Sequence, residues 1–417
     1  GTSRDTSRVL HGFDTNGKDY IRIENLSITK TDSRGGWNEA AVYINGSSNI
    51  DVVNNYFHDI PNVAILSRSY PSYLSNNIYI AGNTMYKVQQ GIGATGNNWL
   101  IENNEINQLL AVYPNGWGED YSRFFGSNIT FRNNYFHGTK WQNVCPPGTP
   151  SYNSSTCQHL DGFQTFSNNG NYARNITIEG NIVQSWGEGV ILDGVNGALL
   201  DGSVGFSCVD IFIKNNVIAG GDESIGEFAG VWGVLNMDCQ NVQVINNDFI
   251  NIPVHGVGFK AYNLPATYPT GIVRNNLFYN SGSNYWSEAG VNFTGGYNFI
   301  SKRSYPDYRQ STDIIPSPTT SSSYRLNETL DPKFINVNLL IGSDGIPFTA
   351  DDGYRLQADS PAINAGINAS TYGVIADISG TTRPQGSVWD IGAYEYYSGQ
   401  SVTPPVSNPV NSLPITP

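Results

Sequence analysis

The chain has 417 residues, among them 45 Gly, 25 Tyr and 18 Phe but only 2 Met, and 14% of its residues are charged. This length exceeds one ordinary compact core unless the chain is built from repeats that contact only their neighbours, and the many aromatic residues argue against disorder. The net charge of −13 argues against nucleic acid as a partner, because phosphate binding needs a basic surface, and no apolar run is long enough to span a membrane.

A short segment recurs along the chain, first from Asp19 ("DYIRIENLSITK") and last from Gly271 ("GIVRNNLFYNS"). One aligned column is asparagine in every later copy: Asn55, Asn83, Asn104, Asn134, Asn181, Asn216, Asn247 and Asn276. The first copy has Leu26 there. Apolar residues alternate on both sides of this column, which is typical of strands with one inward face. We therefore expect the asparagine at a turn between two strands, bonding to the neighbouring coil as one step of a ladder.

A second set of strand-like segments lies between successive asparagines, and each places a small residue beside an apolar one. The residue before the small one forms a further column: Gln90, Asp161, Glu188, Ala229, His255 and Ala289. The shortest step between asparagines approximates a bare coil, so longer steps must contain loops, which in a solenoid tend to cluster on one face.

Over about residues 19 to 300 this pattern resembles the pectate-lyase-like superfamily of right-handed parallel β-helices. The resemblance implies an all-β, single-stranded solenoid of about 10 coils, which we assign to residues 1–325. It does not specify an activity, because the superfamily contains lyases, hydrolases, epimerases, phage tailspikes and adhesins.

The pattern changes from about Leu330 onward. The runs Ser360-Pro361-Ala362-Ile363 and Asp390-Ile391-Gly392-Ala393-Tyr394-Glu395 resemble the choice-of-anchor Q module of bacterial surface proteins. This resemblance implies an exported, often tethered protein, with a β-rich module at residues 326–397 packed on the last coils. Residues 398–417 form a Pro/Ser/Asn-rich linker, which we expect to precede an anchor or a further domain.

Four cysteines allow two disulfides, which indicates a secreted or cell-surface protein. Cys208 and Cys239 occupy the same column in adjacent coils, and stacked strands about 4.8 Å apart suit a disulfide. Cys145 and Cys157 lie in the longest insertion and are expected to close it. A metal site is the weaker alternative, because no Cys-x-x-Cys pair or histidine cluster accompanies them.

Two insertions predict a sugar-binding groove over residues 113–193, because flat rings stack on sugars and carboxylates accept hydroxyl protons. The residues expected to bind substrate are Trp117, Glu119, Asp120, Tyr121, Arg123, Trp141, Gln164 and Asp193. The alternative is that the insertions pack on themselves through their aromatic side chains.

Asp161 and Glu188 are the expected catalytic pair, since consecutive coils place them about 5 Å apart. Two carboxyl groups that close raise each other's pKa, which suits a general acid beside a base or nucleophile. A separation of about 5 to 5.5 Å would match a retaining glycosidase and a wider one an inverting enzyme. The alternative is that both carboxylates bind turn amides.

The segment "HLDGFQ" resembles the "NTDGFD"-type strand of polygalacturonases, where the aspartate before glycine is catalytic. This resemblance implies a catalytic role for Asp161. The chain departs from that family at Gln164, where a second acid would stand, and the paired aspartates are absent from "WGEGVIL".

A lyase would instead need a base and a cation that neutralises the uronate carboxylate. Lys140 and His159 are the expected catalytic residues for that chemistry, with Arg123 and His137 as further candidates. Because the protein is acidic overall, such a site would have to be locally basic.

Asp344, Asp351 and Asp352 form a possible calcium site through carboxylate and carbonyl oxygens, and a pair of Asp-Gly turns is the alternative. No other cofactor is indicated, because no phosphate-binding or dinucleotide motif occurs.

Two functions remain open at this point. The first is an extracellular lyase or hydrolase that acts on a polysaccharide. The second is a non-catalytic adhesin or stalk that binds a cell-surface glycan.

Overall fold

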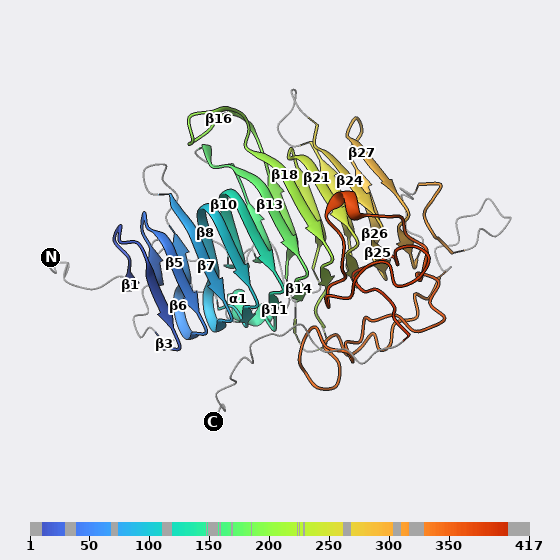
Figure 1. Cartoon of the computed structure of the whole chain (residues 1–417), viewed down its shortest axis with the longest axis horizontal. Helices are drawn as coiled ribbons and strands as arrows, with labels where there is room; N and C mark the ends of the chain where they lie inside the picture. The colour runs from blue at the N-terminus through green and yellow to red at the C-terminus, as the bar shows by residue number, and fades with distance from the viewer. Residues whose placement is uncertain are drawn as a thin grey trace.

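The computed structural model describes residues 11–29, 39–67, 74–110, 119–146, 148, 157, 160–167, 170–184, 186–222, 224, 226–227, 230–261, 268–302, 310–316 and 329–398. These residues form the predicted all-β solenoid, a parallel β-helix whose coils run from β1 at one end to β28 at the other (Figure 1). Within the described residues no helix is long and apolar enough to cross a bilayer.

Three parallel sheets run along the solenoid, and the strands β6, β8 and β10 bend from one sheet into another. The first sheet precedes the asparagine column and contains β2 (Ile21–Glu24), β5 (Ser48–Val53), β7 (Ser75–Ala81), the end of β8 (Thr84–Glu102), the end of β10 (Glu119–Arg132), β13 (Ala173–Glu179), β18 (Cys208–Lys214), β21 (Gln240–Ile245), β24 (Thr270–Arg274) and β27 (Asn292–Gly296).

The second sheet follows the asparagine column and contains β3 (Ser27–Thr29), the start of β6 (Tyr56–Ser67), the start of β8, β9 (Glu105–Asn107), β11 (Tyr135–His137), β14 (Ile182–Gln184), β19 (Val217–Ala219), β22 (Asp248–Ile250), β25 (Leu277–Tyr279) and β28 (Phe299–Ile300). The third sheet contains β1 (His11–Asp14), β4 (Ala40–Ile44), the end of β6, the middle of β8, the start of β10, β12 (Leu160–Thr165), β15 (Glu188–Asp193), β20 (Trp232–Met237), β23 (His255–Lys260) and β26 (Ser283–Ser287).

Three short elements lie outside these sheets: α1 (Trp141–Val144), the antiparallel hairpin of β16 (Asn196–Ala198) and β17 (Val204–Phe206), and a 3₁₀ turn at Ser370–Tyr372.

The predicted asparagine ladder is confirmed and is continuous. The backbone N–H and the Nδ2 of Asn134 both donate to Oδ1 of Asn181, each over 2.9 Å. The same Nδ2 also donates to the carbonyl of Ile101 in the preceding coil, over 3.0 Å. Because this pattern repeats at each step, every buried amide in the ladder is paired, which is the condition for burying it.

The ends of the ladder show what terminates it. At its start the N–H of Leu26, which stands in place of the asparagine, donates to Oδ1 of Asn55. At its far end Asn276 bonds to Asn298, and Asn298 bonds to the carboxylate of Asp313. The repeat alignment ended at Asn276 and therefore missed these last two steps.

The residue before each ladder asparagine has a left-handed backbone, with φ near +54° at Asn54, Asn103 and Asn133 and +64° at Gly180. Asparagine and glycine tolerate this region best, which explains the recurrent Asn-Asn and Gly-Asn pairs. The first residue of each pair therefore makes the turn, and the second joins the coils.

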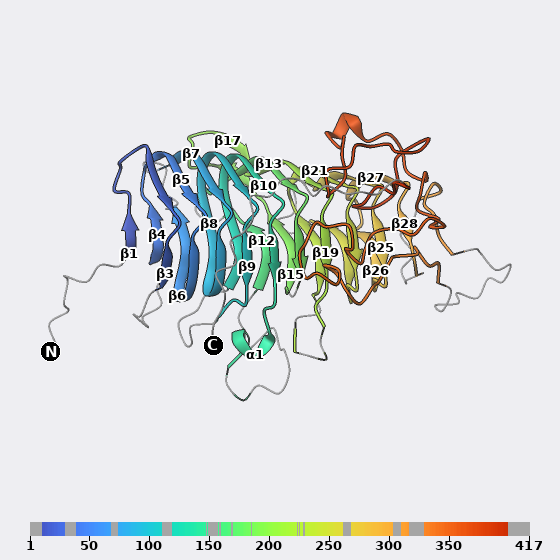
Figure 2. The same cartoon turned by 60° about the horizontal axis from the view of Figure 1, so that its bottom comes forward.

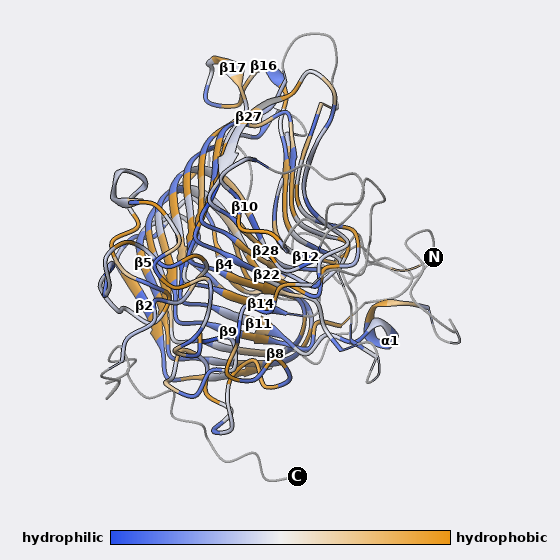
Figure 3. Ribbon diagram, turned by 90° about the vertical axis from the view of Figure 1, so that its right-hand side faces the viewer, coloured by the Kyte–Doolittle hydropathy of each residue, from blue (hydrophilic) through white to orange (hydrophobic). Residues whose placement is uncertain are grey.

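The solenoid interior is a column of apolar side chains from all three sheets. Viewed along the solenoid, apolar and polar residues alternate along the strands, as the period of two predicts (Figure 3). Aromatic rings are in contact from coil to coil: the rings of Phe249 and Phe278 stack with centroids 5.1 Å apart, and those of Phe131 and Phe163 meet edge to face at 5.1 Å.

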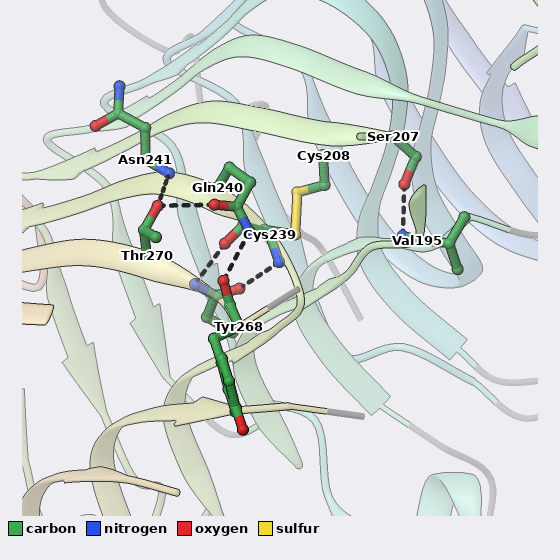
Figure 4. The surroundings of a disulfide bond; sticks show 9 residues. Val195, Ser207, Cys208, Cys239, Gln240, Asn241, Tyr268 and Thr270 are labelled. Carbon is green, nitrogen blue, oxygen red and sulfur yellow. Dashed lines mark hydrogen bonds between the residues drawn. A yellow bond between two sulfur atoms is a disulfide. The ribbon is translucent and has the colours of Figure 1, made fainter. Parts of the chain in front are cut away.

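Both predicted disulfides are confirmed. Cys208 and Cys239 join neighbouring coils with their Cα atoms 4.8 Å apart (Figure 4), and Cys145 and Cys157 are bonded with Cα atoms 4.2 Å apart. Beside the first bond, the hydroxyl of Thr270 accepts the N–H of Asn241, which supports the stack at this corner (Figure 4). Two disulfides agree with an oxidising compartment.

Residues 329–398 pack on the outer face of the second sheet, at the far end from β1 (Figure 1). Apolar residues of this segment such as Ile391 and Tyr394 cluster with Val217, Ile250 and Leu277 of the coils. Asp248 is buried between the two parts and accepts the N–H of Ala393 over 2.9 Å, and burial raises its pKa to about 7. The assignment of this segment to the choice-of-anchor Q class stays a prediction.

The ladder predicts a large stability difference between two asparagines of one coil. Asn181→Ala would leave the Asn134 N–H and the Phe131 carbonyl without their buried partner, so we expect a loss of about 3 kcal/mol in the free energy of unfolding. Asn175 is exposed and bonds only through its side chain to Asn128, so Asn175→Gly, which suits its φ of +54°, should cost about 1 kcal/mol or less. Urea unfolding of both variants measures the difference, and equal losses would contradict a structural role for the ladder.

Candidate functional site

The candidate site is a row of side chains on the outer face of the third sheet. Strand register aligns Asp120, Asp161, Glu188, Trp232, His255 and Ser283 on consecutive coils. Three carboxyl groups thus lie side by side, and the next two coils continue the row with aromatic side chains.

The prediction that Asp161 and Glu188 lie on neighbouring coils is confirmed by their direct pairing in register. The predicted column was wrong further along, because Trp232 and Ser283 hold the positions expected for Ala229 and Ala289. The strand β20 begins at Trp232, and the segment with Ala289 leads into β27 of the first sheet.

The expectation that residues from Glu119 onward belong to an insertion is corrected by β10. This segment is the third-sheet strand of its coil, because Tyr121 and Phe124 point into the core. Tyr121 is fully buried, with its ring stacked 5.3 Å from Phe136, so it packs the interior and does not face a substrate.

Asp120 is a buried support at the edge of the row. Its carboxylate accepts the Nε–H of Arg123 on one oxygen and the backbone N–H of Asp161, over 3.0 Å, on the other. Arg123 is itself buried and already engaged in this ion pair. A lone buried charge would be costly, and this pairing compensates it.

Asp161 is the carboxyl group with the most altered environment. It is fully buried and lies directly beside Glu188 of the next coil in register. Burial and then the negative charges of Asp120 and Glu188 raise the pKa of Asp161 well above its ordinary value. The shift favours the protonated form of Asp161, and Glu188 is the half-buried member of the pair.

The other residues proposed for the groove lie around this row. Gln164 stands beside Arg123 in register, and Asp193 ends β15, where burial and then Asp238 raise its pKa to about 6. Lys140 forms an antiparallel bridge with Glu227 at the start of α1. Trp141 in α1 packs against the core.

The helix α1, which begins at Trp141 directly after Lys140, lies on a projection beside β9 and β12 (Figure 2). In the chain it connects β11 of the second sheet to β12 of the third sheet. Trp117 and His159 fall outside the described residues, as does the side chain of Glu119. The structure therefore groups Asp120, Arg123, Asp161, Gln164 and Glu188, and places Lys140 in a separate backbone pairing.

The row continues into an aromatic cluster, of which the predicted column includes His255 but neither of the two tryptophans. Trp232, His255 and Trp286 lie on adjacent strands of the third sheet, each half-buried on its outer side. The sequence signal of the two tryptophans was weak: Trp232 is the first residue of its strand, and Trp286 lies at an outward position of another strand. Without the correct start of β20, that signal could not be aligned with Glu188.

The calcium site expected at Asp344, Asp351 and Asp352 stays a prediction. Asp351 accepts hydrogen bonds from Ser343, Asp344 and Thr349 of its own loop, and Asp352 accepts the hydroxyl of Tyr394 over 2.9 Å. Within the described ranges, no group of three or more metal-ligating side chains comes together.

No family model matches the sequence, and no curated protein matches it. Among solved structures, the chain is similar to pectate lyase Pel9A, at 14% identity and a TM-score of 0.40 over 90% of this chain and 87% of that one. It is also similar to the surface protein and adhesin PfbA of Streptococcus pneumoniae, at 14% identity and a TM-score of 0.39 over 66% and 67% of the two chains.

A third similar structure is the GH87 α-1,3-glucanase of Streptomyces thermodiastaticus, at 13% identity and a TM-score of 0.24 over 71% and 62% of the chains. At these scores the similarities do not distinguish an enzyme from an adhesin.

The raised pKa of Asp161 predicts how Asp161→Asn changes stability with pH. A carboxyl group whose pKa is raised by folding contributes most below its unfolded pKa, and this contribution is lost as the pH rises through the folded value. The variant carries no such group, so its melting temperature relative to wild type should rise between pH 5 and pH 8. Calorimetry at both pH values measures this, and a variant that is equally destabilised at both would contradict the assignment.

Proposed function

We propose that the protein is a secreted glycoside hydrolase that cleaves a polysaccharide at the Asp161–Glu188 pair. The observation that carries the proposal is a fully buried carboxyl group directly beside a more accessible one, on a row that continues into an aromatic cluster. Paired carboxyl groups with a raised pKa are the groups that acid–base cleavage of a glycosidic bond requires.

Hydrolysis fits this row better than β-elimination does. A lyase needs a cation to neutralise the uronate carboxylate, and Arg123, which lies beside this row, is already paired with Asp120. An anionic sugar would also meet three carboxyl groups on consecutive coils. The pairing of Arg123 and the row of carboxyl groups both disfavour binding of a uronate. They favour a sugar whose hydroxyl groups can bond to the carboxylates.

In the proposed reaction the pair shares one proton. Glu188 delivers it to the glycosidic oxygen, the bond to the anomeric carbon breaks, and the leaving sugar departs with a new hydroxyl group. Water adds to the anomeric carbon and returns a proton to the pair. A shared proton is proposed in place of a covalent intermediate, because the two residues are direct neighbours on adjacent coils.

The second candidate is a glycan-binding adhesin or stalk without catalysis. It is favoured by the complete burial of Asp161, which a purely structural pair would also show. In both cases we propose export to the cell surface or the medium, with residues 329–398 serving as an anchor-type module.

A matched set of variants tests the hydrolase. Glu188→Gln and Asp161→Asn should each lower the release of reducing sugar by about 100-fold or more, because general acid catalysis contributes that much. Asp210→Asn changes a half-buried carboxylate of the first sheet, away from the row, and should not change activity. The substrates are pectin, alginate, glycosaminoglycans and neutral glycans.

The products decide between the alternatives. An unsaturated product with ultraviolet absorbance would mean a lyase and overturn the hydrolase. No product from any of these substrates would favour the adhesin.

A further inference from the structure

An aromatic cluster extends the carboxyl row toward the C-terminal end of the solenoid. The ring of His255 lies 4.2 Å from that of Trp232 and 5.6 Å from that of Trp286, and the two tryptophan rings are 5.9 Å apart. All three side chains stand on the outer side of the third sheet, so they are not part of the apolar interior. A cluster of three partly exposed rings is an amphipathic surface suited to a ligand with flat apolar faces and polar edges.

A glycine in the neighbouring strand makes room for the indole ring of Trp232 on the sheet. Gly258 faces outward between Leu235 and Trp286, and a Cβ atom built on it would lie only 2.2 Å from Cζ3 of Trp232. The indole of Trp232 therefore lies across the neighbouring coil in space that only glycine leaves open.

His255 supplies a hydrogen-bonding group within this surface. Its Nδ1 is buried and has no partner among the described residues. Burial lowers the pKa of His255, so the imidazole is neutral at neutral pH and can accept or donate a hydrogen bond. A hydroxyl group of a ligand stacked on the tryptophans would satisfy this nitrogen.

Strand register fixes where the cluster lies relative to the carboxyl pair. Trp232 is next to Glu188, and His255 is one coil further, so they lie about 5 Å and about 10 Å from Glu188 along the solenoid axis. One coil is close to the length of one sugar unit, so successive sugars of a chain along the axis would meet successive coils.

Charge limits the kind of glycan. The row combines carboxyl groups with a neutral imidazole, and the protein carries a net charge of −13. On β23 the cation Lys260 stands at the opposite end of the strand from His255. A negatively charged glycan would be repelled along this path, whereas an uncharged one would not.

We propose that Trp232, His255 and Trp286 form a stacking platform that binds an uncharged polysaccharide along the solenoid axis and leads it to Glu188. The direction of the chain toward Glu188 rests on the proposed function, whereas the platform itself binds independently of catalysis.

The test is affinity gel electrophoresis of the full chain carrying Glu188→Gln, which prevents turnover. The gels contain soluble α- and β-glucans, xylan or mannan as neutral probes, and polygalacturonate or alginate as acidic probes. We expect at least one neutral probe to retard the protein more than any acidic probe. Trp232→Ala and Trp286→Ala should each weaken that retardation about 10-fold, and Tyr397→Ala, which removes an exposed aromatic ring elsewhere, should not.

Gly258→Ala tests the geometry without removing a ring, because its Cβ must displace the indole of Trp232. It should weaken retardation as Trp232→Ala does, at a melting temperature close to that of the parent. If it unfolds, the two tryptophan variants still decide the outcome. The platform is overturned if neutral probes cause no retardation, if acidic probes bind better, or if both tryptophan variants bind as the parent does.

Failure of the platform is distinguishable from failure of the proposed hydrolase. Neutral-glycan binding that depends on the tryptophans, without any product from wild type, would reject the hydrolase and keep the platform. If wild type forms a product and the tryptophan variants bind as the parent does, the platform is rejected and the hydrolase is kept.

Discussion

The hydrogen bond from one asparagine to the next sets the register of every coil. Each ladder asparagine after Asn55 receives two hydrogen bonds from the preceding asparagine and returns one to a carbonyl of that coil, as the bonds from Asn104 to Asn134 and from Asn134 to Ile101 show. A slip of one residue would break these bonds and turn each strand's apolar face outward. The coils therefore stack in one register, although the loops between them differ in length.

That register is what makes a row of functional groups possible. Asp120, Asp161 and Glu188 come from segments far apart in the sequence, yet the stacking places them side by side. Close packing of carboxyl groups then has an electrostatic consequence, since Asp120 is paired with Arg123 and the pKa of Asp161 is raised. The same stacking brings Trp232 next to Glu188, so a polar and an aromatic region adjoin on one face.

The repeat, the ladder, the inward columns and both disulfides were predictable because each depends on a period that the sequence shows directly. The neighbouring positions of Asp161 and Glu188 followed from that same period. Tyr121 and Ala229 were misassigned for a physical reason, because loops of irregular length hide where a strand begins. A small residue beside an apolar one does not by itself identify the strand's first residue.

Burial was the other property that the sequence did not reveal. The sequence shows that Asp120 and Arg123 are three residues apart, but not that both are buried and paired in the structure. Because Arg123 is paired with Asp120, it is not available to bind a uronate carboxylate, and this pairing favours a hydrolase over a lyase.

The central claim is that stacking in this register creates a proton-carrying carboxyl pair at Asp161 and Glu188. Infrared difference spectroscopy at neutral pH, comparing wild type with Asp161→Asn, tests it most directly. The account predicts a carbonyl band of a protonated carboxyl group in wild type that is absent from the variant. A wild-type spectrum in which Asp161 contributes only carboxylate bands at neutral pH would contradict it.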